Sequence, residues 1–260
     1  MIIYGVFAFL FGTVFGSFYN CMAMRVAVKE DFVKGRSHCM SCGHELSAPD
    51  LVPLLSWILS GGKCRYCGAK VSVRYPLTEA LFGLLTLVLF QMEIGDPLYA
   101  GAGEWIRFVR DFLLAGMLFS LSIVDLMIYE IPNGMLLTAL LAWVVTAPFL
   151  YTLKAAGLSV LAGFVIGAGM LLLSMAMDRI LKKDSLGGGD IKLFALLGLY
   201  TGFFGDYIIL VFSVIFGLLT ILITRKNKIP WGPSIAAGGY IALLFGDGIF
   251  HWYLGITGLA

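Results

Sequence analysis

Charged residues are scarce in this sequence. Only 13% of its 260 residues are Asp, Glu, Lys or Arg, and 60% are hydrophobic, whereas a soluble domain carries about 25% charged residues. So few charges cannot cover the surface of a soluble domain of this size, which excludes an ordinary soluble fold and leaves the lipid bilayer as the solvent. The formal net charge of +2 is also too small to indicate a nucleic-acid partner.

Long apolar stretches follow one another along the chain. A transmembrane helix needs about 17–25 mostly apolar residues, because a rise of about 1.5 Å per residue must cross about 30 Å of hydrocarbon. The sequence therefore predicts an all-α polytopic membrane protein with about eight transmembrane helices. We expect the sixth, which is short, to be a half-span or to lie tilted under its neighbours. The eight stretches cover approximately residues 2–24, 75–92, 111–130, 134–151, 156–178, 190–204, 207–224 and 233–258.

The basic residues between these spans predict the orientation of the chain. Of the 18 Lys and Arg residues, only Arg107, Arg110 and Lys154 fall in the even-numbered loops. Because basic residues are retained on the cytoplasmic side, we expect the odd-numbered loops in the cytoplasm and both termini outside. No basic residue precedes Arg25, so we expect the first span to be an uncleaved helix rather than a signal peptide.

One long polar stretch, from about Ala27 to Arg74, separates the first two spans and is predicted to be cytoplasmic. This polar stretch divides the chain into three predicted parts. Residues 1–26 would form the first transmembrane helix, residues 27–74 a small cytoplasmic four-cysteine domain, and residues 75–260 a seven-helix membrane core.

Four of the five cysteines form two Cys-x-x-Cys pairs in this polar stretch. Cys39 pairs with Cys42 and Cys64 with Cys67, and a glycine follows the second cysteine of each pair. Two such turns direct four thiolates at one centre, about 2.3 Å from a tetrahedral zinc ion. We therefore predict a closed, structural Zn²⁺ site that folds a domain too small to be stable alone.

Other roles for the cysteines are weighed against the metal site. Two disulfides or a redox relay would use the same four residues, but a reducing cytosol disfavours disulfides. His38 and His44 flank the first pair and could each replace a thiolate. Cys21 lies inside the first span and is expected to be a small apolar residue rather than a ligand.

Two aspartates lie at the edges of predicted spans, where ionisable groups are expensive and are functional candidates. Asp125 lies near the end of the third span, about 7 Å below the cytoplasmic surface. Asp190 follows three glycines, 187–189, and opens the sixth span. Because both spans reach the cytoplasm at these ends, two carboxylates from different helices are predicted at one depth on one side of the membrane.

A pair of neighbouring carboxylates suits acid–base chemistry. The two cannot both ionise a few ångströms apart, so one keeps a proton while the other acts as general base on a shared water. The charged member activates water against a peptide carbonyl, and the protonated member donates to the developing oxyanion and then to the leaving amine. The alternatives are a helix N-cap for Asp190 and an ion-pathway role for Asp125.

Two more ionisable residues are predicted at the same membrane face. Lys192 is expected to extend toward the interface, although it would oppose a rise in the proton affinity of Asp190 if it turned inward. Glu79 follows Pro76 at the start of the second span, where it complements the helix dipole or supports the site.

Six features in order resemble the type IV prepilin peptidases, which belong to the GxGD intramembrane aspartyl proteases. The likeness covers nearly the whole chain. The features are Gly16-Ser17-Phe18-Tyr19-Asn20 with Arg25, the paired Cys-x-x-Cys units, Arg74-Tyr75-Pro76 with Glu79, Asp125 with Ile131-Pro132-Asn133, Gly187-Gly188-Gly189-Asp190-Ile191-Lys192-Leu193, and Pro230-Trp231-Gly232-Pro233.

This resemblance implies a function and a set of site residues. Members of the family remove a short basic leader from prepilins and pseudopilins, whose N-terminal helix is apolar, at the cytoplasmic face of the bacterial inner membrane. Many then N-methylate the new N-terminal residue with S-adenosylmethionine. By likeness Asp125 and Asp190 would be the catalytic pair, and Gly187 and Gly189, with Lys192 and Glu79, would support the site or bind substrate.

A different class of function is kept as the alternative. A membrane carboxylate can also gate a cation transporter, here with a regulatory zinc domain. Transporters often contain internal repeats, and the sequence shows no convincing one.

Overall fold

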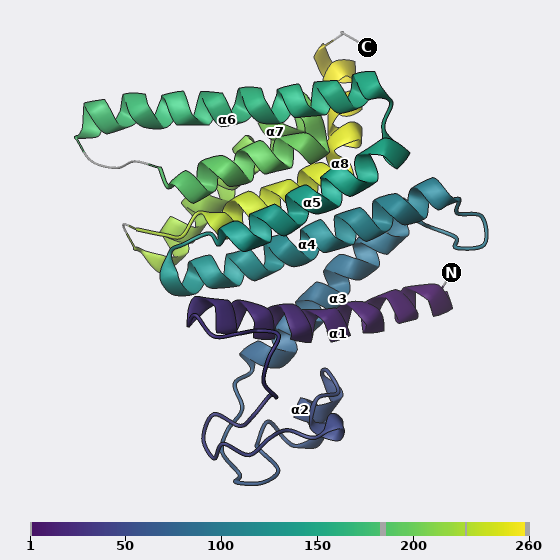
Figure 1. The fold of residues 1–260 in the computed structure, drawn as a ribbon, viewed down its shortest axis with the longest axis vertical. Coiled ribbons are helices and arrows are strands. Elements are labelled where there is room, and N and C mark those ends of the chain that lie inside the picture. The colour runs from purple at the N-terminus through teal and green to yellow at the C-terminus, as the bar shows by residue number, and fades with distance from the viewer. Residues whose placement is uncertain (1, 183–185, 227, 258–260) are drawn as a thin grey trace. The chain divides into compact units, whose positions relative to one another are not determined.

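The computed structural model describes residues 2–182, 186–226 and 228–257, and these residues are almost entirely helical (Figure 1). Seven of the helices within them are long and apolar enough to cross a membrane. The predicted all-α, multi-pass fold is therefore confirmed. The seven are α1 (Ile2–Ala27), α3 (Arg74–Glu93), α4 (Ala102–Ile128), α5 (Asn133–Leu150), α6 (Leu153–Leu181), α7 (Gly188–Thr224) and α8 (Gly232–Thr257).

Two short helices, η1 (Ala48–Asp50) and α2 (Leu55–Leu59), lie between α1 and α3 in the cysteine-bearing segment. The chain forms two compact units, Met1–Phe112 and Leu113–Ala260. Each unit has its own buried core. Residue 258, which ends the last predicted span, lies outside the described residues.

Small residues bring α1 and α3 together in the first unit (Figure 1). A Cβ atom at Gly12 would lie 2.6 Å from the Thr86 side chain, and one at Gly16 would lie 2.9 Å from the Phe82 side chain. The Tyr19 ring packs on Phe82 with 5.1 Å between centroids. The two helices therefore run antiparallel in close contact.

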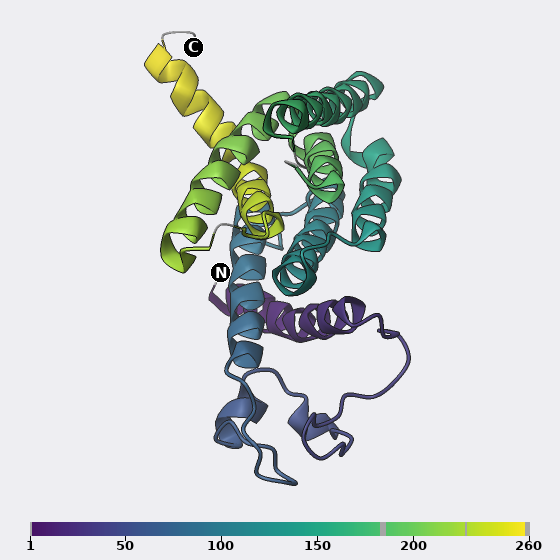
Figure 2. The same ribbon diagram turned by 90° about the vertical axis from the view of Figure 1, so that its left-hand side faces the viewer.

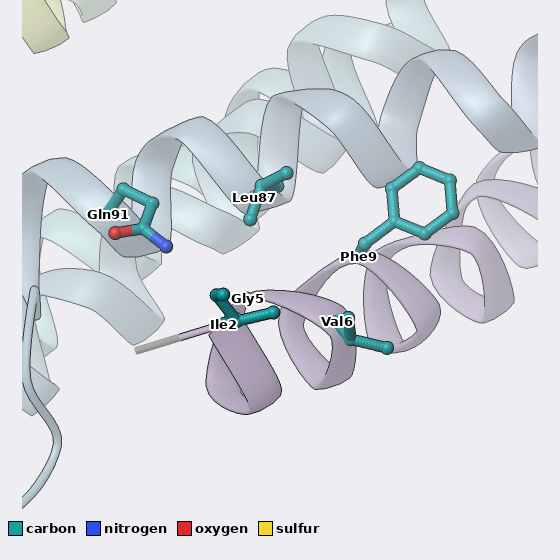
Figure 3. A pocket seen from close by; sticks show the side chains of 6 residues that line it. All are labelled: Ile2, Gly5, Val6, Phe9, Leu87 and Gln91. Atoms are coloured by element: carbon teal, nitrogen blue, oxygen red, sulfur yellow. The ribbon is translucent and has the colours of Figure 1, made fainter.

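At the far end of the same helix pair, α1 and α3 diverge around an apolar pocket of about 330 Å³ (Figure 3). The amide of Gln91 is the one polar side chain that lines it. The lining residues are Ile2, Gly5, Val6, Phe9, Leu87 and Gln91.

The start of α4 differs from the sequence prediction. The predicted span began at residue 111, but the helix begins at Ala102 and carries Arg110 and Asp111 inside the fold, with 4% and 1% of their side chains exposed. The Arg110 guanidinium donates two hydrogen bonds to the Asp111 carboxylate, at 2.6 and 2.8 Å. Because each charge has the other as its partner, both can be buried, and hydropathy alone began the span too late.

In the second unit, α7 doubles back on itself at Gly202, whose φ of 67° and ψ of −175° interrupt the helix. A Cβ atom at Gly198 would lie 2.6 Å from Oδ2 of Asp206, although eight residues of straight helix span about 12 Å. Trp231 contacts both halves of α7, before and after Gly202. The centroid of its ring lies 5.5 Å from that of Phe194 in the first half, and its indole N–H donates to the Ser213 carbonyl in the second half. The sixth and seventh predicted spans are therefore the two antiparallel halves of α7.

Close backbone contacts also join α7 to α6 and α8 (Figure 2). A Cβ atom at Gly163 of α6 would lie 2.5 Å from the carbonyl oxygen of Ala195. On the other side, one at Gly238 of α8 would lie 2.9 Å from the carbonyl oxygen of Ile209. Large apolar side chains instead point outward, for example Phe164 at 72% and Ile223 at 81% exposure, as expected of surfaces that face lipid.

Substituting Gly163 by alanine should destabilise the second unit, because the added methyl group would overlap the Ala195 carbonyl. Overpacking of this kind costs about 1–3 kcal/mol, which thermal melting of the purified protein in detergent will show as a lower midpoint. Gly169→Ala is the matched control on the same helix, since nothing lies within 4 Å of its added Cβ. Equal midpoints for the two variants would contradict the packing described for α6 and α7.

Candidate functional site

The two Cys-x-x-Cys segments fold into matching turns. In each, the glycine that follows the second cysteine donates its N–H to the carbonyl of the first cysteine, at 2.8 Å for Gly43 and 2.9 Å for Gly68. The φ angles of these glycines are 70° and 72°, a backbone conformation that favours glycine. The same local structure is therefore built twice.

The four sulfur atoms of these turns face one centre. Those of Cys39, Cys42, Cys64 and Cys67 lie within 4.8 Å of one another, and those of Cys39 and Cys67 are 3.9 Å apart. Sulfurs placed tetrahedrally at about 2.3 Å from a zinc ion would be separated by about 3.8 Å. The backbone N–H groups of Cys42 and Ser41 lower the pKa of the Cys39 thiol to about 6. The four cysteines are thus positioned to bind a metal ion.

The competing roles for these cysteines have less in their favour. All five cysteines are free, and the cluster found among the described residues contains no histidine. The His44 ring instead stacks on Tyr66, with 3.6 Å between centroids. Asp50 links the segment after the first turn to the second turn, because its Oδ2 accepts hydrogen bonds from the hydroxyls of Ser47, at 2.7 Å, and Tyr66, at 2.9 Å. These bonds, led by the one from Ser47, lower the pKa of Asp50.

Asp125 lies near the end of α4 with 5% of its surface exposed. Its Oδ2 accepts a hydrogen bond of 2.8 Å from the backbone N–H of Gly232, the first residue of α8. A Cβ atom at Gly232 would lie 2.6 Å from this same oxygen. The indole N–H of the preceding Trp231 donates to the Ser213 carbonyl at 3.2 Å. A fixed helix N-terminus without a side chain therefore meets the Asp125 carboxylate.

Asp190 lies in the first turn of α7, and the N-cap position belongs to Gly187. A Cβ atom at Gly187 would lie 2.9 Å from Oδ2 of Asp190, and one at Gly189 would lie 2.9 Å from Cβ of Ile131. Nothing lies within 4 Å of the position of a Cβ at Gly188. The first and third glycines therefore make room for the carboxylate and for the segment after α4, whereas the middle one is unconstrained.

The ends of α4, α7 and α8 bring the two aspartates together. Asp125 and Asp190 lie within range of a direct electrostatic interaction. Lys192 does not neutralise them through an ion pair, because it is exposed and its Nζ donates to Oδ1 of Asn133 at 3.0 Å. This bond joins the start of α7 to the start of α5.

Glu79 belongs to the first unit and lies near the start of α3, with 7% of its surface exposed. Its Oε2 accepts a hydrogen bond of 2.8 Å from the backbone N–H of Leu54, in the segment between the cysteine pairs. The carboxylate therefore has a specific partner in the cysteine-bearing segment besides the dipole of its own helix.

Two features of the second unit were missed by sequence reasoning. Gly232 was noted only as part of the segment 230–233, although a glycine between Trp231 and Pro233 at a helix start indicates close backbone contact. Asp206 was placed between two spans, yet it is 2% exposed, and in the part of the chain that the structure describes neither carboxylate oxygen receives a hydrogen bond. A single aspartate in an apolar run was the available signal.

Two family profiles match consecutive parts of the chain. One, described as the Bacterial Peptidase A24 N-terminal domain, matches residues 10–92 and includes the four cysteines and Glu79. The other, described as the Type IV leader peptidase family, matches residues 112–222 and includes Asp125 and Asp190.

Whole-chain relatives agree with these profiles. A prepilin leader peptidase/N-methyltransferase of Aeromonas salmonicida (strain A449) is 33% identical over 289 aligned positions, covering 97% of this chain and 94% of the relative. The chain belongs to the type IV leader peptidase family. A relative of the same name from Bacillus subtilis (strain 168) is 31% identical over 258 positions, covering 95% of this chain and 96% of its own.

A third member of the type IV leader peptidase family is named a type 4 prepilin-like proteins leader peptide-processing enzyme. It comes from Escherichia coli O78:H11 and is 31% identical over 270 positions, 94% of this chain and 95% of its own. No solved structure matches the chain. The family resemblance inferred from six sequence features is confirmed.

The cysteine cluster generates a stoichiometric prediction. Protein purified under reducing conditions without chelator should contain about one metal ion per chain by elemental analysis, and Cys64→Ser should bring this close to zero, because three thiolates do not complete a tetrahedral site. Cys21→Ser is the matched control, since Cys21 lies outside the cluster. Metal-free wild-type protein, or equal metal in both variants, would contradict the site.

Proposed function

We propose that this member of the type IV leader peptidase family is an intramembrane aspartyl endopeptidase that removes the short basic leader of type IV prepilins and pseudopilins. The observation that carries the proposal is the approach of Asp125 and Asp190 from different helices, with the start of α8 hydrogen-bonded to one of them. A pair of carboxylates in an apolar setting is the constellation that peptide hydrolysis through a shared water requires.

The surroundings of the two aspartates suggest which one acts as the general base and which one as the general acid. Asp125 accepts the Gly232 N–H, an interaction that stabilises a charged carboxylate, so we assign it as the base that takes a proton from water. The resulting hydroxide oxygen bonds to the peptide carbonyl carbon. Asp190 gives the shared proton to the carbonyl oxygen, which yields a tetrahedral diol. As the C–N bond breaks, the Asp125 proton passes to the leaving nitrogen and one hydroxyl proton of the diol returns to Asp190, which leaves a carboxylic acid, an amine and the pair with its shared proton.

We infer that this site opens to the cytoplasm. The loop between α7 and α8, which leads to the start of α8 at this site, carries Arg225, Lys226 and Lys228, and basic residues are retained on the cytoplasmic side. By the same rule we infer that both termini lie outside and that the four-cysteine segment, residues 27–74, lies in the cytoplasm. A leader that is itself basic and stays on that side would meet the site there.

We further propose that the metal ion is Zn²⁺ and that its role is structural. Four thiolates around one centre are a ligand set that suits zinc, and such a site leaves no coordination position open for substrate. The ion would hold together a segment with two short helices and few buried residues.

The names of the relatives join leader peptidase to N-methyltransferase, so we propose that the new N-terminal residue is then methylated. S-adenosylmethionine, as methyl donor, would supply the methyl group. Family membership gives no support to the alternative of a carboxylate-gated cation transporter.

Asp125→Asn and Asp190→Asn should each reduce leader cleavage by at least about 100-fold, because an amide can neither take the proton from water nor share it. The double variant should be no worse, since residues that act as a unit are not additive. Purified protein in detergent micelles is incubated with a prepilin and S-adenosylmethionine, without any ion gradient, and the mass of the product's N-terminus is measured.

Asp247→Asn is the matched control for this experiment, because Asp247 is an exposed aspartate of α8. Substantial cleavage by either single variant would disprove the catalytic pair. Absence of cleavage by the wild-type protein would disprove the proposed peptidase, whereas cleavage without a gradient contradicts the transporter.

Gly232→Ala should lower the rate of leader cleavage by about 10- to 100-fold, because the new methyl group displaces Asp125 from the Gly232 N–H. A hydrogen bond to a charged group contributes about 1.5–3 kcal/mol, and each 1.36 kcal/mol changes a rate about tenfold. Gly188→Ala is the control, since its methyl group enters open space. Comparable rates for both variants would show that the contact with α8 does not matter for cleavage.

A further inference from the structure

A second polar junction lies between α1 and α3, in the first unit. Along this antiparallel pair, Gly12 faces Thr86, and one turn later Gly16 faces Glu79 and Phe82. Asn20 is the next residue on the same face of α1 and is therefore level with the first turn of α3. Because helical side chains lean toward the helix N-terminus, the Glu79 carboxylate is directed to the level of Asn20.

Both side chains at this junction are buried hydrogen-bond acceptors. Asn20 is 2% exposed and Glu79 is 7% exposed. The amide oxygen Oδ1 of Asn20 receives no hydrogen bond from any described residue. Oε2 of Glu79 receives one, from the Leu54 N–H, and none of the ion pairs formed within the described ranges involves Glu79. Two buried acceptor groups thus lie at the same level of this helix pair, and none of the described ion pairs supplies either with a cation.

The chain segment that donates a hydrogen bond to Glu79 is held in an uncommon conformation. Leu54 has φ 61° and ψ −53°, and the N–H of Leu55 donates to the Pro53 carbonyl at 2.6 Å, which together define a classic-type γ-turn. Such turns are rare and strained, by about 1–3 kcal/mol per residue, and persist where surrounding contacts fix them. One of these contacts is the hydrogen bond that the Leu54 N–H donates to the Glu79 carboxylate.

The chemistry of the junction selects the kind of ligand. A buried amide oxygen and a buried carboxylate repel an anion and leave an apolar group with unpaired polar atoms. A primary ammonium carries three N–H donors and one positive charge, which matches both oxygens. The Tyr19–Phe82 ring pair beside Gly16 and Asn20 adds aromatic surface, which also favours a cation.

We propose that Asn20 and Glu79 bind an α-ammonium group, that of the new N-terminus that leader cleavage creates. This inference rests on the proposed function, because cleavage supplies the amine and methylation consumes it. The methyl donor also carries an α-ammonium group, and the experiment below distinguishes the two sources. Asn20 and Glu79 are thereby binding residues for the second reaction and take no part in peptide hydrolysis.

The direct test measures binding rather than turnover. The full-length protein in detergent micelles is titrated with a fluorescent peptide that has the N-terminal sequence of a processed prepilin, with its α-amino group either free or acetylated. The wild-type protein should bind the free amine at least about tenfold more tightly, the size expected of a hydrogen bond to a charged group. Asn20→Leu and Glu79→Gln should bring this ratio close to one.

Matched variants separate recognition of the ammonium group from a structural role. Asn20→Asp keeps the acceptor and should preserve or increase the preference for the free amine. Gln91→Leu removes an amide from the other end of the same helix pair, where Gln91 lines the apolar pocket (Figure 3), and should leave the ratio unchanged. Thermal melting identifies variants that fail to fold, and the comparison of Asn20→Asp with Glu79→Gln remains decisive if Asn20→Leu is one of them.

The outcomes distinguish this inference from the proposed function. Leader cleavage and methylation are measured in parallel: methylation should be lost in Asn20→Leu and Glu79→Gln, and Gln91→Leu should leave both activities unchanged. A wild-type protein that cleaves the leader but binds the free and acetylated peptides equally would disprove the ammonium site and leave the peptidase standing. If the variants instead keep the peptide preference and lose affinity for S-adenosylhomocysteine, the α-ammonium group bound at the junction is that of the methyl donor.

Discussion

In a bilayer, a polar or charged group has to find its partner inside the protein, because the hydrocarbon offers none. Three buried sites of this chain follow that constraint, whereas Asp206 receives no hydrogen bond from the described residues. Asp125 accepts a backbone N–H from α8, Arg110 is paired with Asp111, and Glu79 accepts the Leu54 N–H. Two of these contacts join segments far apart in the sequence, so the few ionisable side chains fix which helix ends meet.

Backbone N–H groups are free for such contacts only at the first turn of a helix, and this explains why the candidate site is built from helix ends. A carboxylate can reach a backbone N–H closely only when the residue that carries it is small. Gly232 meets this condition for Asp125, and Gly187 leaves room for Asp190. Some of the 32 glycines of the chain are thus needed because backbone N–H groups serve as hydrogen-bond donors to buried carboxylates.

Most of the fold could be predicted from the sequence, since apolar runs and paired cysteines are local patterns with direct physical meaning. The positions of Asp125 and Asp190 at one end of their helices followed from the same reasoning. The partner of Asp125 could not be predicted. Every residue except proline has a backbone N–H, so the sequence does not indicate which one will donate to a given carboxylate. Hydropathy likewise placed Asp206 between two spans and began the third span only after Arg110, because it counts charges without knowing whether they are paired or buried.

The charge of the cleavage product gives a physical reason for two separate polar junctions. Hydrolysis starts from a neutral peptide bond and releases an amine that becomes a cation at neutral pH. An ammonium group retained beside Asp125 and Asp190 would stabilise both as charged carboxylates, and the pair would lose the shared proton that the next hydrolysis needs. A set of acceptors elsewhere, without a cation of its own, removes the product from the pair, and Asn20 with Glu79 has this character. The Asp125–Asp190 pair is therefore suited to the neutral peptide bond before cleavage, and Asn20 with Glu79 is suited to the ammonium group after it.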